Sequence, residues 1–537
     1  MQDRQTARRQ DSETTRYVLA IDLGSGGQKA AVVADTGDVV ARAEEKITTQ
    51  LLPGGGAEQD PENWWEGVRK TARRVVRESG VAPENIVAVG CDSQWSVVVA
   101  VDESTQPLMQ AVHWMDTRGG PYNCRITAGF PGLQGYGLLK LLRWVKLTGL
   151  VPTHSGVDSL GHVLFIKHER PAIYADTYKF LEPMDFLTAR LTGKITATQK
   201  TMAPFVVVDN RKWGSLEYSD ALLNLAGLDK EKFPTLIPND GIVGPILPAM
   251  AEDLGLHPAT QVVAGVSDSN ASIIGSGSVQ DFEAIIYIGT SLYMTCHVPF
   301  KKTDLTHFMT SLPSPFKSRY YLLGEQGAGG KCVEFFLNNI VYCNDGLETG
   351  PRPDDAYRLF NKSAAEAPPG SGGVIFLPWL IGAIVPSEDP YVRGGFVNLS
   401  LNTTRSHMSR AVMEGLAYNS RWTREAAEKF IGRRIGSFRF SGGGALSDVW
   451  AQIHADVLGV PILQVDDPIN TTLLGTAFLA FTVLGYRALV DIPKLVKIKR
   501  VYQPDESNRA VYDHLYTQYR ELFKRNRKIF KSLNLQK

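Results

Sequence analysis

Asp22 is a carboxylate at the end of an apolar run, two residues ahead of a glycine-rich turn. The run covers residues 17–21, and the turn reads Gly24-Ser25-Gly26-Gly27. Glycine and hydroxyl residues in a tight turn expose N–H groups that form a small anion-binding concavity. A carboxylate there would repel a phosphate unless a divalent cation lay between them, which makes Asp22 a candidate Mg²⁺ ligand acting through water. A turn-capping aspartate explains the same position equally well.

Asp268 ends a second apolar run, residues 262–266, and stands in the polar segment Ser267-Asp268-Ser269-Asn270. In doubly wound sheets, ligand chemistry gathers at the carboxyl ends of strands. Asp268 could therefore be a general base that takes a proton from an attacking hydroxyl. The alternative is that Asp268 caps a helix over residues 269–274.

A second turn, Gly289-Thr290-Ser291, repeats the design of the first between apolar residues 285–288 and 292–295. We expect the glycines of both turns to supply positive φ angles and room for a ligand. One such turn alone could simply close a hairpin. Two of them, at corresponding places in the two halves, predict a duplicated fold that grips the phosphates of a nucleotide from both sides.

A third glycine-rich segment lies between an expected strand at 438–440 and an expected helix at 447–458. It reads Ser441-Gly442-Gly443-Gly444-Ala445. A helix N-terminus with a close glycine approach suits an anion or an adenosine edge, although tight strand-to-helix turns also need glycine. The chain has no GxxxxGK[ST] and no GxGxxG opening a dinucleotide-binding unit, so two commoner nucleotide folds lose support.

Polar and aromatic residues follow neighbouring strands of the first half, in Ser93-Gln94-Trp95-Ser96 and Trp114-Met115-Asp116-Thr117-Arg118. Hydrogen-bonding groups match sugar hydroxyls, and an indole face covers the C–H surface of a sugar. These residues are therefore candidates for binding a polyhydroxylated substrate. A surface ion pair between Asp116 and Arg118 is the alternative.

The composition is that of an ordinary globular protein. The chain has 537 residues, 43% of them hydrophobic and 21% charged, with a net charge of +1. This length predicts two large domains, and the charge balance argues against nucleic acid as a partner. Five scattered cysteines without a CxxC pair are typical of reduced thiols, and no apolar stretch is long enough for a membrane span. We expect a cytoplasmic protein.

The elements that must position these residues alternate between strand and helix, which predicts an α/β fold. Expected strands at 17–22, 30–34 and 39–43 are followed by a helix over 62–78 and by strand patterns at 86–91 and 96–101. Helical spacing marks residues 161–193 and 407–430, and residues 473–485 indicate a buried helix. Residues 117–159 interrupt the alternation as an insertion, and residues 1–16 are predicted to be a disordered leader.

Taken together, these motifs resemble the FGGY carbohydrate kinases of the actin-like ATPase superfamily, above all the xylulokinase and gluconokinase branches, from about Tyr17 to Phe523. Asp22 to Lys29 resembles the first phosphate loop, Gly289-Thr290-Ser291 the second, and Ser441 to Ala445 the adenosine loop. Gly265-Val266-Ser267-Asp268 is similar to the catalytic-aspartate motif. The sequence departs from the family at Asn398, where a glycine is usual, and at Gln94-Trp95-Ser96-Val97, where xylulokinases have Gln-Met-His-Gly.

The resemblance implies two actin-like, ribonuclease H-like domains with an ATP and sugar cleft between them. Residues 17–280 would form the sugar-binding domain and residues 281–537 the ATP-binding domain with a C-terminal helix. Asp268 would be the catalytic base, and Asp22 would lie near Mg²⁺. The implied ATP-binding residues are Gly24, Ser25, Gly26, Lys29, Gly289, Thr290, Ser291, Gly442, Gly443, Gly444 and Ala445. The implied substrate-binding residues are Gln94, Trp95, Trp114, Asp116, Arg118, Asp268 and Asn270.

The reaction implied is transfer of the ATP γ-phosphate to a hydroxyl of a ketopentose such as xylulose. Gluconate and polyols are alternative substrates within the same family. A sugar-binding pseudokinase and an actin-like ATPase are alternatives of another functional class. The protein could also form a homodimer.

Overall fold

The computed structural model describes residues 15–133, 135–343, 345, 347 and 350–535. Residues 1–14 of the predicted leader lie outside this part. The chain divides into two compact units, each built from segments that are distant in sequence. The first unit contains residues up to Gly277 together with Leu312–Tyr320 and Thr472–Leu495, and the second unit contains the remaining segments.

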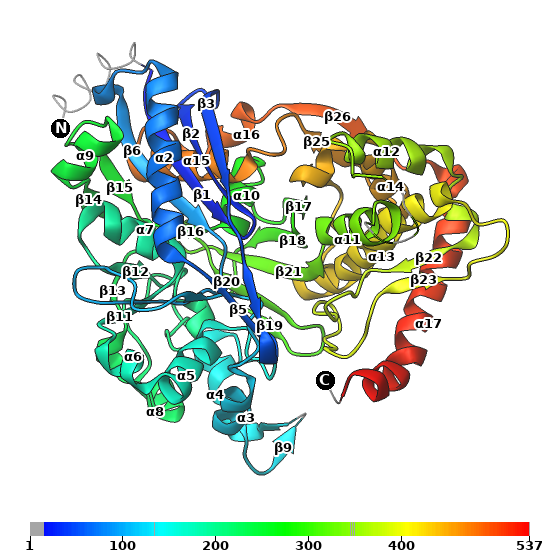
Figure 1. The fold of residues 1–537 in the computed structure, drawn as a ribbon, viewed down its shortest axis with the longest axis horizontal. Helices are drawn as coiled ribbons and strands as arrows, with labels where there is room; N and C mark the ends of the chain where they lie inside the picture. The colour runs from blue at the N-terminus through cyan, green and yellow to red at the C-terminus, as the bar shows by residue number, and fades with distance from the viewer. Residues whose placement is uncertain (1–14, 134, 344, 346, 348–349, 536–537) are drawn as a thin grey trace. The chain divides into compact units, whose positions relative to one another are not determined.

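The first unit is built on a seven-stranded sheet with the order β14-β15-β6-β1-β2-β3, to which β16 adds by pairing with β6 (Figure 1). Strands β1, β2 and β3 form an antiparallel meander, whereas β6 runs parallel to β1 and to β15. The strands span Tyr17–Gly24 (β1), Gly27–Ala34 (β2), Val39–Lys46 (β3), Ile86–Ser93 (β6), Ile242–Pro245 (β14), Gln261–Val263 (β15) and Val266–Ser267 (β16). The predicted α/β alternation is therefore confirmed.

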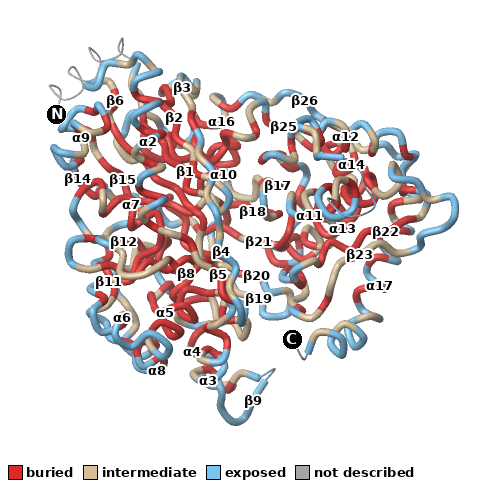
Figure 2. Tube along the Cα trace, viewed as in Figure 1, coloured by how far each residue is buried: buried red, intermediate tan, exposed pale blue. Residues whose placement is uncertain are grey.

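Helices cover both faces of this sheet. Leu19, Ile21 and Leu23 of β1 belong to the same apolar core as Trp64 and Val68 of α2 (Pro61–Ser79), which crosses β1 to β3 in Figure 1. Side chains of a strand alternate between its faces, so Asp22 points to the opposite face. There α15 (Thr471–Val483) packs, as the hydrogen bond from Thr472 to Asp22 shows. Figure 2 shows the central strands as buried.

The second unit repeats this plan in an eight-stranded sheet with the order β19-β20-β21-β18-β17-β24-β25-β26. In both sheets a hairpin, β1–β2 or β17–β18, lies beside two parallel strands and an antiparallel edge strand. The strands span Ala284–Ile288 (β17), Ser291–Val298 (β18), Thr303–Asp304 (β19), Met309–Pro313 (β20), Tyr320–Ala328 (β21), Phe438–Ser441 (β24), Ile462–Val465 (β25) and Ile498–Tyr502 (β26). The predicted duplication is present in the topology.

The remaining helices follow the local sequence signals at several ends. Gly193 and Gly459 end their helices with left-handed backbone, which glycine adopts at little cost, and Ser447 caps α14 through its side chain. The main helices are α4 (Leu138–Thr148), α5 (Ser159–Glu169), α6 (Pro171–Asp176), α7 (Pro183–Thr192), α9 (Pro248–Leu254), α10 (Asp268–Gly275), α11 (Gly330–Phe336), α12 (Ala356–Glu366), α13 (Arg405–Ile431), α14 (Asp448–Leu458) and α17 (Arg509–Asn534).

One predicted helical stretch, residues 161–193, is wrong as a single element. It is divided into α5, α6, the strand β11 (Lys179–Leu181) and α7. Pro171 and Pro183 each stand at the first position of the helix that follows, where the missing N–H costs nothing. Prolines therefore mark the new helix starts.

Candidate active site

Asp22 lies at the carboxyl end of β1 and is almost fully buried. Its Oδ2 accepts a hydrogen bond from Nζ of Lys29 at 3.0 Å and another from Oγ1 of Thr472 at 2.8 Å. Lys29 is the direct partner of Asp22 across the β1–β2 hairpin. The carboxylate is thus held in place from a neighbouring strand and from helix α15.

Asp268 is the first residue of α10, and the predicted capping role for it is wrong. Ser267 is the N-cap, because its side chain accepts a hydrogen bond from the N–H of Asn270. Asp268 Oδ1 accepts one hydrogen bond from the N–H of Ser269. Burial of the carboxylate, with the negative charge of Asp22 adding to it, raises the pKa of Asp268 to about 7.

Asn270, the third residue of α10, is buried, and its Nδ2 donates to Oγ of Ser267 at 3.0 Å. Its Oδ1 is buried without a hydrogen-bond partner among the described residues. A buried amide oxygen of this kind is able to accept a hydrogen bond from a ligand.

Asp92 is a third carboxylate at this edge of the sheet, and the sequence analysis missed it. It stands on β6 directly opposite Asp22 in the parallel β1–β6 register, and it is fully buried. Burial, together with the charges of Asp22 and Asp268, raises the pKa of Asp92 well above its usual value. The signal that could have found it is the one that found Asp22, a carboxylate ending an apolar strand.

The first glycine turn is held by a chain of buried side chains. Nε2 of Gln59 donates to the carbonyl oxygen of Ser25 at 2.9 Å, and Nε1 of Trp114 donates to Oγ of the same serine at 2.8 Å. Gln59 Oε1 accepts from Nε2 of Gln94 at 2.8 Å, and Oε1 of Gln94 lies 2.9 Å from Nε2 of His113. The predicted substrate residues Gln94 and Trp114 are therefore connected to the predicted phosphate turn.

The glycines of this turn do not have the positive φ angles that we expected. None of Gly24, Gly26 and Gly27 has left-handed backbone, and neither has Gly289 in the second unit. Close approach explains two of them, because a Cβ on Gly24 or Gly27 would lie 3.1 or 3.0 Å from a backbone oxygen. Gly26 faces open space, which leaves its backbone accessible to a ligand.

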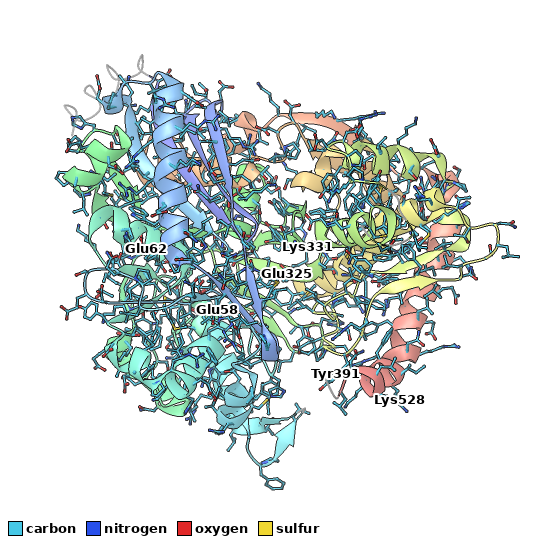
Figure 3. The ribbon with its side chains drawn as sticks, in the orientation of Figure 1. Glu58, Glu62, Glu325, Lys331, Tyr391 and Lys528 are labelled. Carbon is cyan, nitrogen blue, oxygen red and sulfur yellow. The ribbon has the colours of Figure 1, made fainter. Side chains whose placement is uncertain are left out.

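Asp116 and Arg118 form an ion pair in which the aspartate is buried and the arginine is partly buried, so the surface-pair alternative is wrong. Asp116 is fully buried, and its Oδ2 accepts from Nη2 of Arg118 at 2.6 Å and from the N–H of Ala57 at 2.8 Å. Arg118 Nη2 also donates to Oε1 of Glu58 at 2.6 Å (Glu58 is labelled in Figure 3). These contacts occupy much of the hydrogen-bonding capacity of both side chains.

Trp95 is half-buried, and its Nε1 donates to the carbonyl oxygen of Thr201 at 3.2 Å. Its only N–H donor is therefore used within the protein, which leaves the flat face of the indole for contact with a ligand. The neighbouring Ser96 has a φ of 59°, so the segment turns sharply at this point.

In the second unit, two of the predicted nucleotide turns meet at one strand end. Gly442 has a φ of 81°, and a Cβ there would lie 2.5 Å from the carbonyl oxygen of Ile288, the last residue of β17. Gly444 packs against the side chain of the same isoleucine. The second turn begins at Gly289, with Thr290 exposed and Ser291 partly exposed. Gly443 and Ala445 lie in the short helical turn ahead of α14.

Two family models match the chain, and together they cover most of it. The N-terminal domain of the FGGY family of carbohydrate kinases matches residues 17–275, and the C-terminal domain matches residues 284–484. The chain belongs to the FGGY family of carbohydrate kinases. As a member of this family it is an enzyme, a phosphotransferase that uses ATP and an alcohol group as acceptor. The predicted resemblance is confirmed.

Individual relatives of this FGGY kinase are distant in sequence. A xylulose kinase of Bacillus subtilis is 25% identical over 512 residues, which cover 95% of this chain and 97% of the relative. A gluconokinase of the same species is 26% identical over 475 residues, covering 88% of each chain. The solved structure of a gluconate kinase from Lactobacillus acidophilus superposes with a TM-score of 0.82 and 23% sequence identity. The match covers 97% of this chain and 100% of the gluconate kinase chain, so the two share the fold.

The departure from the family at Asn398 has a structural counterpart. Asn398, where the family usually has glycine, has a φ of 68°, and its Nδ2 donates to the carbonyl oxygen of Gly373 at 3.0 Å. Asparagine tolerates this left-handed conformation better than most residues. The replacement therefore preserves the turn.

The carboxylate side chain at this site fits a Mg²⁺ ion whose coordination shell is completed by other ligands. Within the described ranges, no three His, Cys, Asp or Glu side chains are placed to hold a metal ion on their own. Mg²⁺ in phosphoryl-transfer sites is commonly bound by one or two carboxylates together with water and substrate phosphates. Asp22, buried at the strand end beside the glycine turn, fits this requirement.

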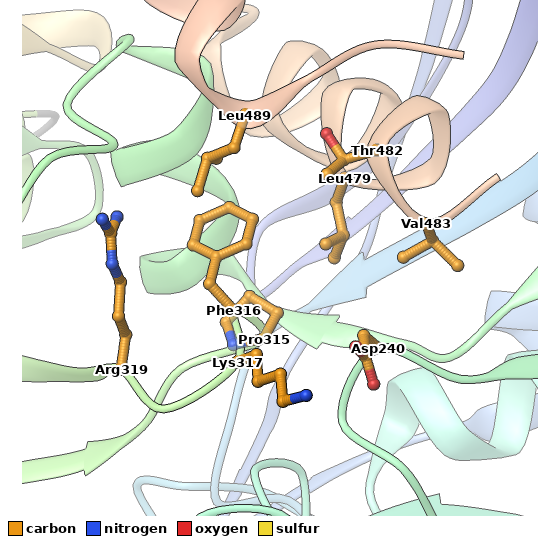
Figure 4. Close-up of a pocket in the computed structure, with 9 residues that line it drawn as sticks. All are labelled: Asp240, Pro315, Phe316, Lys317, Arg319, Leu479, Thr482, Val483 and Leu489. Carbon is orange, nitrogen blue, oxygen red and sulfur yellow. The ribbon is translucent and has the colours of Figure 1, made fainter. Parts of the chain in front are cut away.

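A cavity of about 380 Å³ in the first unit lies apart from these residues. Figure 4 shows Phe316, Leu479 and Leu489 on its walls, with Asp240 and Lys317 nearby, and it contains none of the predicted site residues. None of the helices in the described part of the chain is both long and apolar enough to cross a membrane.

Proposed function

We propose that this FGGY kinase transfers the γ-phosphate of ATP to a hydroxyl of a ketopentose such as xylulose, with Asp268 as the general base. The observation that carries the proposal is that Asp22 lies near the carboxyl end of β1 and Asp268 directly follows β16, the two strands that pair with β6, close enough for the charge of Asp22 to raise the pKa of Asp268. A pKa of about 7 suits a base that must take a proton near neutral pH. The xylulose kinases among the relatives support the choice of sugar.

In this mechanism the sugar hydroxyl gives its proton to the free carboxylate oxygen of Asp268 as its own oxygen attacks the γ-phosphorus. The bond from the γ-phosphorus to the bridging oxygen breaks, and ADP leaves. A Mg²⁺ ion bound near Asp22 would neutralise phosphate charge. Lys29 positions Asp22, and the backbone at Ser25 and Gly26 offers N–H groups to phosphate oxygens.

The other residues proposed to bind the nucleotide are the Gly289-Thr290-Ser291 turn and Gly442, Gly443, Gly444 and Ala445. The exposed hydroxyl of Thr290 and the helix N-terminus at α14 are suited to phosphate and adenosine. Gln94, Trp95, Trp114, Asp116, Arg118 and Asn270 would surround the sugar, with the Trp95 indole covering its C–H face.

Gluconate or a polyol is a second candidate substrate, which the gluconokinase relatives favour. A sugar-binding pseudokinase has less support, because neither Asp22 nor Asp268 is replaced. Three further predictions remain untested. They are the division into a sugar domain at 17–280 and an ATP domain at 281–537, the homodimer, and the cytoplasmic location.

A coupled assay of ADP release, run with ketopentoses, aldonates and polyols, tests the proposal. We expect one sugar class to accelerate ADP release strongly in the parent enzyme. Asp268→Asn should lower kcat by roughly two to four orders of magnitude while leaving ATP and sugar binding intact, because only the proton acceptor is lost. Asp220→Asn, at an exposed position, is the matched control. Near-normal turnover in the folded Asp268→Asn enzyme would contradict the assignment.

Sugar choice is tested at Trp95 and Ser96, which replace Met and His of xylulokinases. The double change Trp95→Met with Ser96→His should lower KM for D-xylulose and raise kcat/KM by about tenfold or more, because a ring donor returns to the pocket. Kinetics with D-xylulose and gluconate on both enzymes provide the measurement. If the change leaves the preference between the two sugars unaltered, this segment does not set specificity.

A further inference from the structure

We propose that Asp92 is a second carboxylate of the Mg²⁺ site, facing the same cation as Asp22. This inference rests on the proposed function of Asp22. It assigns a cation-binding role to a residue that the family resemblance did not single out.

The register of the sheet brings the two carboxylates together. Asp22 and Asp92 are direct partners in the parallel β1–β6 ladder. Directly paired residues on adjacent strands project from the same face, and adjacent strands lie about 4.8 Å apart. The two side chains therefore leave the sheet side by side, on the face that α15 covers.

Helix α15 contacts both carboxylates in the same way. Thr472 donates to Oδ2 of Asp22 at 2.8 Å, and Thr476, one turn later, donates to Oδ2 of Asp92 at 2.6 Å. Residues four apart lie on the same face of a helix. The pair of threonines therefore orients one oxygen of each aspartate and leaves the other oxygen of Asp92 to a different partner.

That other oxygen, Oδ1 of Asp92, is buried and has no hydrogen-bond partner among the described residues. Asp92 itself is 0% exposed. Because a buried carboxylate oxygen without a partner is costly, such an atom calls for a ligand. Asp92 therefore offers an unpartnered oxygen on the face of the sheet from which Asp22 also projects.

The charges at this edge of the sheet are also unbalanced. Asp22, Asp92 and Asp268 bring three carboxylates together, whereas Lys29 forms an ion pair with Asp22. A divalent cation between Asp22 and Asp92 would offset this excess. Two carboxylates with water and phosphate oxygens complete the octahedral set that Mg²⁺ requires.

Mn²⁺ binding in the presence of ADP, followed by electron paramagnetic resonance, tests the proposal without any sugar turnover. Asp92→Asn keeps the shape of the side chain and removes its charge, so we expect the Mn²⁺ affinity to fall by about tenfold or more. Asp22→Asn should weaken Mn²⁺ binding at least as much. Asp185→Asn removes another fully buried carboxylate of the same unit and should leave Mn²⁺ affinity unchanged.

Thermal unfolding with and without Mn²⁺-ADP provides the second readout, since a ligand that binds the folded state raises Tm. The increase should be smaller in Asp92→Asn, and in Asp92→Ser if the asparagine variant fails to fold. Mn²⁺ affinity equal to that of the parent in a folded Asp92 variant overturns the proposal. Absence of sugar-dependent turnover would instead contradict the proposed function, so the two failures are distinguishable.

Discussion

At the scale of single residues, Asp268 links the structure to the pH dependence of the reaction. Its pKa is raised to about 7, chiefly by burial. A general base works only when deprotonated, so lowering the pH through this value removes the active form. As the proposed general base, Asp268 would set the acid limb of the activity profile.

We therefore expect kcat/KM for the sugar to fall about tenfold per pH unit below pH ~7 and to level off above it. A kcat/KM profile measured between about pH 5.5 and 8.5 at constant ionic strength checks this. Asp268→Asn should lose the acid limb together with most of the activity. A flat profile from about pH 5.5 to 8 in the parent would mean that a different group accepts the proton.

Single-residue signals predicted part of this site. Asp22 and Asp268 were predicted because each ends an apolar strand beside glycine or serine. Asp92 also ends an apolar strand, but Ser93 and Gln94 follow it in place of a glycine turn, and the segment was interpreted as sugar-binding. Its closeness to Asp22 depends on strand register, which local spacing does not specify.

At the scale of elements, α15 is the helix on which the carboxylate edge depends. Gly475 lies between Thr472 and Thr476 along the chain, and a Cβ on this residue would lie 1.7 Å from the carbonyl oxygen of Ala271 in α10. The two helices therefore pack with their backbones in near contact. Since Asp268 begins α10, the position of the proposed general base depends on this packing.

Gly475→Ala should consequently destabilise the protein by about 1–3 kcal/mol or more, because an extra methyl group must push two backbones apart. It should also lower kcat, as α10 shifts with Asp268. Urea unfolding and ADP-release kinetics provide the two measurements. Gly436→Ala is the control, since a Cβ there meets nothing within 4 Å and should change stability by less than about 0.5 kcal/mol. Equal stability of the two variants would show that α10 and α15 are more loosely packed.

The sequence predicted this helix but not its contacts. Its apolar composition indicated a buried element at 473–485, close to the observed Thr471–Val483. The hydrogen bonds from Thr472 and Thr476 join residues 450 and 384 positions apart. Helical periodicity identifies a buried face, but it does not identify the partner of that face.

At the scale of the whole molecule, the duplicated plan was visible in the sequence because the two glycine turns follow similar apolar strands. The two sheets repeat the same arrangement of a hairpin, two parallel strands and an antiparallel edge. The return of Leu312–Tyr320 and Thr472–Leu495 to the first unit was not predicted. Each is a short segment inside a longer stretch of the second unit, with no change in composition to mark it.

The return of α15 has a consequence for genetics. A nonsense codon at position 472 would leave the segments 1–277 and 312–320 of the first unit intact in the message. The truncated product would nevertheless lack the helix whose hydroxyls hold Asp22 and Asp92. Loss of the last 66 codons would therefore damage the amino-terminal unit as well as the carboxyl-terminal one, and neither unit is encoded by one uninterrupted stretch of the gene.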